Sequence, residues 1–159
     1  MSTLRPTLAI LFLTVVPALQ AQPQPHEHAS TTASPATLAT GLGALHHAIA
    51  TKNADAQRFF DQGLTYVYGF NHDEAIRSFR RAAELDPASP MPHWGVALAL
   101  GPNINLNVDP DREKAAYDEA QRAKALAEGA PANERAYVNA LLTRYSNDPK
   151  ADLKALAVQ

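Results

Sequence analysis

The chain has 159 residues, of which 46% are apolar, 14 are Lys or Arg, 16 are Asp or Glu and none is Cys. This length fits one ordinary domain with flanking segments, and the formal charge of −2 argues against a nucleic-acid-binding face, which needs many more basic side chains. The lack of cysteine excludes disulfides, thiolate metal sites and a cysteine nucleophile.

Residues 1–21 are predicted to be a secretory signal peptide. Arg5 supplies a positive charge, Thr7–Val16 is a largely apolar run, and Ala21 offers a small residue for cleavage. A bilayer span needs about 20 apolar residues, so this run is too short for a membrane anchor. The sequence therefore predicts an exported protein, periplasmic or extracellular, that has no membrane span after cleavage.

Residues 22–52 are predicted to be a flexible linker followed by a lead-in to the folded part. The first half is rich in proline and small polar residues and shows no apolar periodicity. Apolar residues then recur at helix-like spacing, which predicts a short docking segment before the first helix. These residues are Leu42, Leu45 and Ile49.

From residue 53 onward the apolar residues follow the 3.6-residue period of helices. Asn53 is the predicted N-cap of a first helix, which the segment 69–72 interrupts, and Asp73 opens a second helix that ends at Asp86-Pro87. Two short helices joined by so tight a turn are expected to be antiparallel. Their buried sides hold Phe59, Phe60, Gly63, Leu64, Tyr66 and Val67 in the first helix, and Ala75, Ile76, Phe79, Ala82, Ala83 and Leu85 in the second.

Residues 56–89 resemble a tetratricopeptide repeat, a helix–turn–helix unit with small and large residues at fixed offsets. Matching residues are Phe59, Gly63, Tyr66, Ala75, Phe79, Ala82 and Pro87. The chain departs from the repeat at Gln62, where Leu is usual, and at Gly69, which comes one place before the usual turn glycine. The resemblance implies that Gly63 and Ala75 are small where the two helices touch. The chain is also similar to the first part of longer exported bacterial tetratricopeptide proteins.

The resemblance extends, less regularly, over residues 53–159. It implies an all-α solenoid of about three antiparallel helix pairs. Unit 1 covers residues 53–89, unit 2 covers 90–130, and a partial unit 3 covers 131–159. Because the last helix lacks the polar outer face of a terminal repeat, we expect the natural chain to continue beyond Gln159.

Units 2 and 3 contain four further predicted helices. Met91–Leu100 and Asp109–Gly129 form unit 2, with a long joining segment over 101–110. A helix beginning at Pro131 and a short last helix form unit 3. The expected inner residues are Trp94, Val96, Ala97 and Leu100, then Ala116, Ala120 and Ala123, then Tyr137, Leu141, Leu142 and Tyr145, and finally Leu153, Leu156 and Val158.

The resemblance implies a protein–protein interaction scaffold of tetratricopeptide type. Such proteins bind a peptide or a partner helix along the concave surface lined by the first helix of each pair. By family position, the groove residues of unit 1 are Gln57, Phe60, Leu64, Val67 and Tyr68. Relatives that clamp acidic tails have Lys and Asn at such places, so we expect an apolar segment here, either residues 42–49 of this chain or later repeats. The alternative role of the five residues is packing against a neighbouring helix.

Histidines leave open a second function, that of a periplasmic metal-binding or metal-handling protein. Imidazole is a common metal ligand, but a structural zinc site needs four converging ligands. The predicted hairpins would have to bring the candidate ligands together. These candidates are His46, His47, His72 and His93.

Enzyme motifs are absent from the sequence. It has no Gly-rich phosphate loop, no Gly-x-Ser-x-Gly elbow and no His-Glu-x-x-His helix. The acidic pairs Asp73/Glu74 and Asp118/Glu119 are adjacent on helices, so their side chains point apart. We therefore expect no catalytic residue, no enzymatic activity and no cofactor. A non-catalytic domain of a larger exported enzyme is a further alternative.

Overall fold

The computed structural model describes residues 36–103, 109–148 and 150–156. The predicted signal peptide, the first part of the predicted linker, positions 104–108 of the joining segment and Val158 lie outside these ranges. The described residues belong to one compact unit, Ser34–Gln159. None of their helices is long and apolar enough to cross a membrane.

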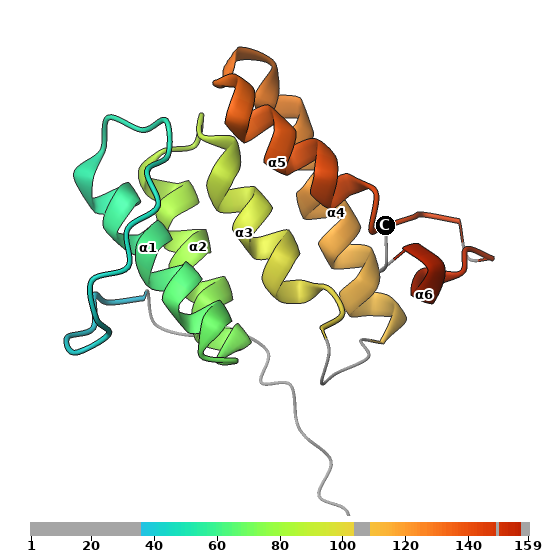
Figure 1. Ribbon diagram of the computed structural model, residues 1–159, viewed down its shortest axis with the longest axis horizontal. Coiled ribbons are helices and arrows are strands. Elements are labelled where there is room, and N and C mark those ends of the chain that lie inside the picture. The colour runs from blue at the N-terminus through green and yellow to red at the C-terminus, as the bar shows by residue number, and fades with distance from the viewer. Residues whose placement is uncertain (1–35, 104–108, 149, 157–159) are drawn as a thin grey trace, which may run out of the picture. The chain divides into compact units, whose positions relative to one another are not determined.

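Every regular element within the described ranges is a helix, so the fold is all-α, as predicted (Figure 1). The helices are α1 (Ala54–Tyr68), α2 (His72–Leu85), α3 (Pro90–Leu100), α4 (Pro110–Leu126), α5 (Ala132–Leu142) and α6 (Leu153–Leu156), with a 3₁₀ turn η1 (Ala127–Gly129) after α4.

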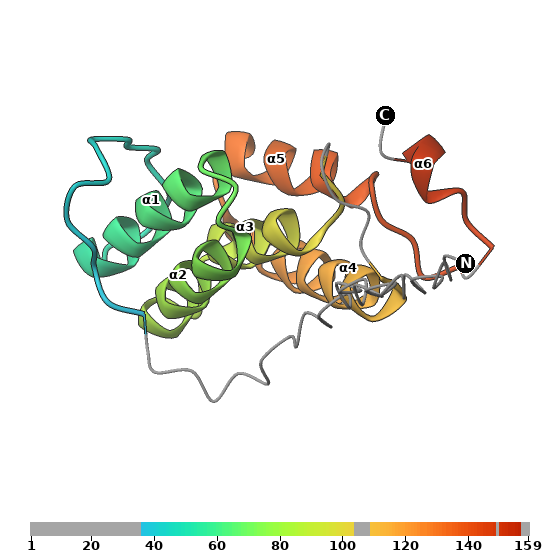
Figure 2. The ribbon, with the colours of Figure 1, turned by 90° about the horizontal axis from the view of Figure 1, so that it is seen from below.

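The five longer helices form two layers (Figures 1 and 2). α1, α3 and α5 lie side by side in one layer, and α2 and α4 lie behind them. α1 packs on α2, α2 on α3, and α3 on α4, while α5 packs on both α3 and α4. Each helix therefore buries its apolar stripe mainly against its neighbours in the chain, as in stacked helix pairs.

Local capping explains where the first two helices begin. Asn53 caps α1 as predicted, since its side-chain oxygen accepts two N–H groups of the first turn. α2 begins at His72, one residue before the predicted start at Asp73. The reason is that Asn71 takes the cap position and accepts the N–H of Glu74.

The second pair, α3 and α4, lies close to its predicted bounds. Asp109 caps α4, and Pro110 occupies its first turn. The inner side of α4 consists of small residues, which let the helix approach α3 closely. These are Ala116, Ala120 and Ala123, all buried as predicted.

The core is centred on Phe79 of α2, whose side chain is fully buried. Gly63 of α1 and Gly95 of α3 face the ring from two sides, and a Cβ atom at either glycine would lie 2.5 Å from a ring carbon. The close contact predicted at Gly63 is confirmed. Gly95 adds a contact that the sequence had not indicated, so three helices meet at one ring.

Tyr137 of α5 is not an inner residue, and this prediction was wrong. Its side chain is 43% exposed, and the neighbouring Val138 is buried instead. Adjacent helical residues point about 100° apart, so the apolar spacing alone did not separate the two. Tyr145 is buried as predicted, and its hydroxyl donates a hydrogen bond to the carbonyl of Ala97 at 2.8 Å.

Residues 36–50 dock along α1, as predicted, but as an extended segment and without the helix-like spacing that was expected (Figure 1). Gly41 and Gly43 have φ angles of 81° and 84°, in the left-handed region that interrupts a helix. Ile49 is buried, whereas Leu45 is exposed. We call residues 36–50 the strap.

Candidate peptide-binding face

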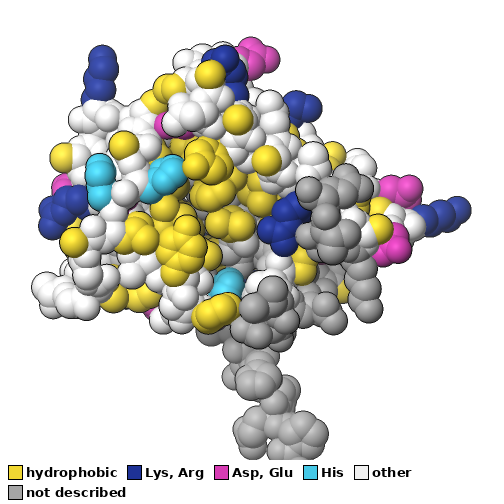
Figure 3. All heavy atoms as spheres, in the orientation of Figure 1, with side chains coloured by type: hydrophobic (Ala, Val, Ile, Leu, Met, Phe, Trp, Pro, Cys, Tyr) yellow, Lys and Arg dark blue, Asp and Glu magenta, His cyan; other side chains and the backbone are white. Residues whose placement is uncertain are grey.

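The strap wraps around α1 (Figure 2): its first residues lie beside α2, and its last residues cross the outer side of the α1–α3–α5 layer, which faces the viewer in Figures 1 and 3. We call this side the α1–α3–α5 face. Apolar side chains gather over the middle of the face (Figure 3). The strap contacts α1 and α5, and these contacts define the site.

Gln57 of α1 holds the strap main chain at two points. Its Oε1 accepts the N–H of Ile49 at 2.9 Å, and its Nε2 donates to the carbonyl of His47 at 2.9 Å. The same Nε2 donates to Asp61 at 3.0 Å, which orients the amide. A primary amide presents a donor and an acceptor side by side, so it binds an extended main chain without contacting the side chain between the two bonds.

Gln62 repeats this arrangement on the side of α1 next to α2, about 140° around the helix from Gln57. Its Oε1 accepts the N–H of Ala39 at 2.8 Å, and its Nε2 donates to the carbonyl of Thr37 at 3.0 Å and to the Ser78 hydroxyl at 3.0 Å. Gln62 is buried, and its polar atoms are satisfied by these bonds. The strap therefore accounts for a polar residue where the tetratricopeptide repeat has Leu. That departure from the repeat is the sequence signal of the contact.

Two carboxylates bind further N–H groups of the strap. Asp61 of α1 accepts the N–H of His47 at 3.0 Å and pairs with the imidazole of His46 at 2.8 Å. Glu134 of α5 accepts the N–H of Ala50. The strap is thus held by both outer helices of the layer. Asp61 and Glu134 were not predicted as site residues.

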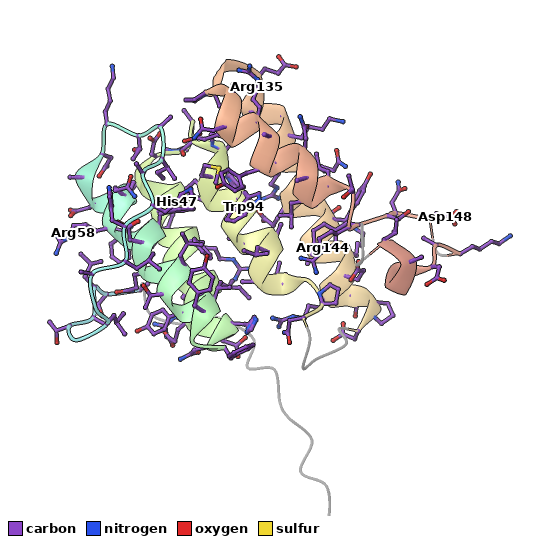
Figure 4. All side chains as sticks on the ribbon, viewed as in Figure 1. His47, Arg58, Trp94, Arg135, Arg144 and Asp148 are labelled. Atoms are coloured by element: carbon purple, nitrogen blue, oxygen red, sulfur yellow. The ribbon has the colours of Figure 1, made fainter. Side chains whose placement is uncertain are left out.

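A cluster of four rings joins the strap to all three helices of the layer. The His47 ring lies 6.0 Å from Phe60 of α1 and 5.5 Å from Tyr137 of α5, measured between ring centroids. The ring of Trp94 in α3 contacts the rings of Phe60 and Tyr137. Its indole N–H also donates a hydrogen bond to the Tyr137 carbonyl at 3.1 Å. Figure 4 shows His47 and Trp94 close together on this face. The exposed position of Tyr137 is therefore part of the site.

The five predicted groove residues have different environments. Gln57 and Phe60 contact the strap, as described above. Phe60 and Leu64 are buried, so both also serve the alternative role of core packing. Val67 is half-buried against the core, and Tyr68 is 69% exposed near the end of α1.

The four candidate metal ligands lie with different partners and do not converge. His46 pairs with Asp61, His47 stacks on Phe60 and Tyr137, His72 lies beside Phe70 and Asn103, and His93 pairs with Glu119. In the part of the chain that the structure describes, no group of three or more His, Asp or Glu side chains is placed to hold a metal ion.

The surroundings of His72 and of the His93–Glu119 pair shift the pKa of His72 and of Glu119. Burial and the Arg112 guanidinium lower the pKa of His72, which favours its neutral form. Burial raises the pKa of Glu119, but its hydrogen bond with His93 and the nearby positive charges outweigh this effect and lower the pKa on balance. The His93–Glu119 pair, 2.8 Å apart, joins α3 to α4 across the two layers. It is separate from the strap contacts.

Comparisons of the chain with protein-family models, with curated proteins and with solved structures found no match. What the α1–α3–α5 face binds is therefore inferred from its own geometry.

Proposed function

We propose that this chain is an exported protein–protein interaction scaffold of tetratricopeptide type, which binds an extended peptide on its α1–α3–α5 face. One observation carries the proposal. Gln57 already holds an extended main chain on this face, through one accepted and one donated hydrogen bond. Main-chain recognition of this kind is suited to peptide segments.

The bonding pattern favours an extended peptide over a partner helix. Helical N–H and C=O groups are already paired within the helix, apart from those at its ends. Gln57 needs a free N–H and a free C=O on the same edge of the ligand, as the strap supplies at residues 47–49. An extended segment offers both.

The tetratricopeptide part of the proposal is supported by packing. Gly63 and Phe79, at matching positions of the repeat, meet between α1 and α2. The helices also stack in chain order, with α1, α3 and α5 in one layer. In a tetratricopeptide solenoid, the first helices of successive pairs line the binding surface.

The test is to select peptides from a random linear library on the full chain and to measure their affinity by fluorescence anisotropy. The strap of the tested chain is loosened by Ala39→Pro and Ala50→Pro, which remove the N–H groups that Gln62 and Glu134 accept. In that chain, Gln57→Ala is expected to weaken binding about tenfold, because two hydrogen bonds to the peptide main chain are lost. Gln121→Ala is the matched control, since Gln121 is a half-buried glutamine on α4. Equal peptide affinity of the two variants would contradict the proposal. Binding of the selected peptides to α2 and α4 instead of the α1–α3–α5 face would also contradict it.

A further inference from the structure

The strap occupies the place where a partner peptide would bind. We propose that residues 36–50 are an intramolecular competitor, which a neutral or basic extended segment of a partner protein displaces from the α1–α3–α5 face. This inference rests on the proposed function, because it takes the same face as the binding site.

The strap is bound through main-chain hydrogen bonds together with a few side-chain contacts, which include the ring of His47. Two of its side chains, Ala36 and Ile49, are buried in the core, while those around the main-chain contacts, such as Thr37, Ala39 and Ala48, are exposed. Hydrogen bonds to main-chain N–H and C=O groups do not depend on which side chains follow one another. A different extended segment can therefore make the same main-chain bonds, and it needs an apolar side chain at the position of Ile49 to replace the buried contact.

The attachment of the strap to α1 limits which residues move. The Thr51 hydroxyl donates to Asp86, and the Asn53 side-chain amide donates to the carbonyl of Leu85 at 3.0 Å. Both bonds fasten the chain to the end of α2, directly after the strap. Release of the strap therefore stops at residue 50 and leaves the cap of α1 in place.

The charges on the face select the partner. Asp61 and Glu134 accept N–H groups of the strap, and His46 adds a donor to Asp61. An acidic segment would place like charges beside both carboxylates, which is unfavourable. The ring of His47 lies between Phe60 and Tyr137, so the matching position of a partner suits an aromatic or imidazole ring.

The inference is tested with a fluorescein-labelled synthetic peptide of residues 36–50, added to the full chain. In the protein, Ala39→Pro with Ala50→Pro removes the N–H groups that Gln62 and Glu134 accept. Ala44→Pro is the matched control, because it introduces proline into an exposed part of the strap between the two sets of contacts. The double variant is expected to bind the peptide at least about tenfold more tightly than the wild type and the control.

A second variant and a second peptide complete the test. His47→Ala in the protein removes only the ring contacts and is expected to act in the same direction, so the test holds even if the proline variant does not fold. A peptide with Glu at positions 46 and 47 is expected to bind at least about tenfold more weakly. Equal affinity of that peptide would overturn the inferred partner chemistry.

Two results would separate the inference from the proposed function. Equal peptide affinity for the wild type and all variants would show that the strap does not compete, while peptide binding itself would stand. A folded variant whose strap amides exchange freely has released its strap. If such a variant binds no peptide, both proposals are overturned, because the vacated face then fails to hold an extended chain.

Discussion

Phe70 has a backbone conformation that favours glycine. Its φ angle is 58°, while the preceding Gly69 has a φ of −83°, so the turn glycine stands one place too early. A left-handed conformation costs an L-residue roughly 1–2 kcal/mol. The Phe70 side chain is 57% exposed, so little burial offsets this cost.

We therefore expect Phe70→Gly to raise the free energy of unfolding by about 1 kcal/mol, measured by urea denaturation. Gly69→Ala is the control, because its Cβ would have only ordinary contacts. A loss of stability in Phe70→Gly would show that the contact between the rings of Phe70 and His72 outweighs the backbone strain.

Glu113 of α4 is a buried carboxylate. It is 5% exposed, and neither carboxylate oxygen has a hydrogen-bond partner among the described residues. Burial raises the pKa of Glu113 above its ordinary value of 4.5, against the opposing effect of the Arg144 charge. In the folded chain the group therefore binds its proton more tightly than in the unfolded chain, and its ionisation lowers the stability as pH rises above that ordinary value.

Glu113→Gln is expected to raise the melting temperature at about pH 7, because the variant buries no charge. The difference should disappear at about pH 3, where the wild-type carboxyl is protonated in both states. Thermal unfolding followed across this pH range measures it, with Glu128→Gln as the exposed control. A gain of the same size at both pH values would contradict burial of the charge as the cause.

At the scale of elements, the contact of α1, α2 and α3 at Phe79 leaves no room for an extra methyl group. A helical Gly→Ala change would otherwise add about 1 kcal/mol of stability. Here the new Cβ would lie 2.5 Å from the buried ring, from Gly63 or from Gly95. The cost of overpacking should exceed the gain in helix propensity, so the free energy of unfolding of each variant is expected to fall by about 1–3 kcal/mol.

Gly129→Ala is the control for this prediction, since nothing lies within 4 Å of its Cβ position. Urea denaturation of the three variants compares them directly. A Gly95→Ala variant as stable as the wild type would show that α3 can move away from Phe79 without cost.

Helix positions were predictable because their determinants are local. Asn53 and the Asp86-Pro87 pair mark helix ends through their own side chains and backbone, and these ends were located to within one residue. Which of Tyr137 and Val138 is buried was not predictable, since both side chains are apolar and the residues are adjacent. It depends on where α5 meets α3 and α4, which is a tertiary property.

The strap contacts could be predicted only in part. That residues 42–49 would lie against the repeats was one of the expected arrangements, but the residues that hold the strap were mostly missed. Gln62 and Glu134 bind main-chain N–H groups that lie 23 and 84 residues away in the sequence. Every non-proline residue carries the same N–H group, so no side-chain pattern records such a partner.

At the scale of the whole molecule, the strap links the first and last long helices of one layer. When no partner is bound, the contacts of the strap with Gln57, Gln62 and Glu134 join α1 to α5. If a partner peptide replaced the strap, the helices would stay in place. The central claim is therefore that α1 holds an extended main chain in solution through Gln57 on the α1–α3–α5 face, with Gln62 holding the start of the strap beside α2.

Amide hydrogen exchange of the full chain, resolved by residue, tests this claim most directly. We expect the N–H groups of Ala39 and Ile49 to exchange more slowly than that of the exposed Ala44. Gln57→Ala should speed exchange at Ile49 more than at Ala39, and Gln62→Leu should do the reverse, with the core amides of α2 unchanged. Exchange of all strap amides at unfolded-chain rates in the wild type would contradict the claim.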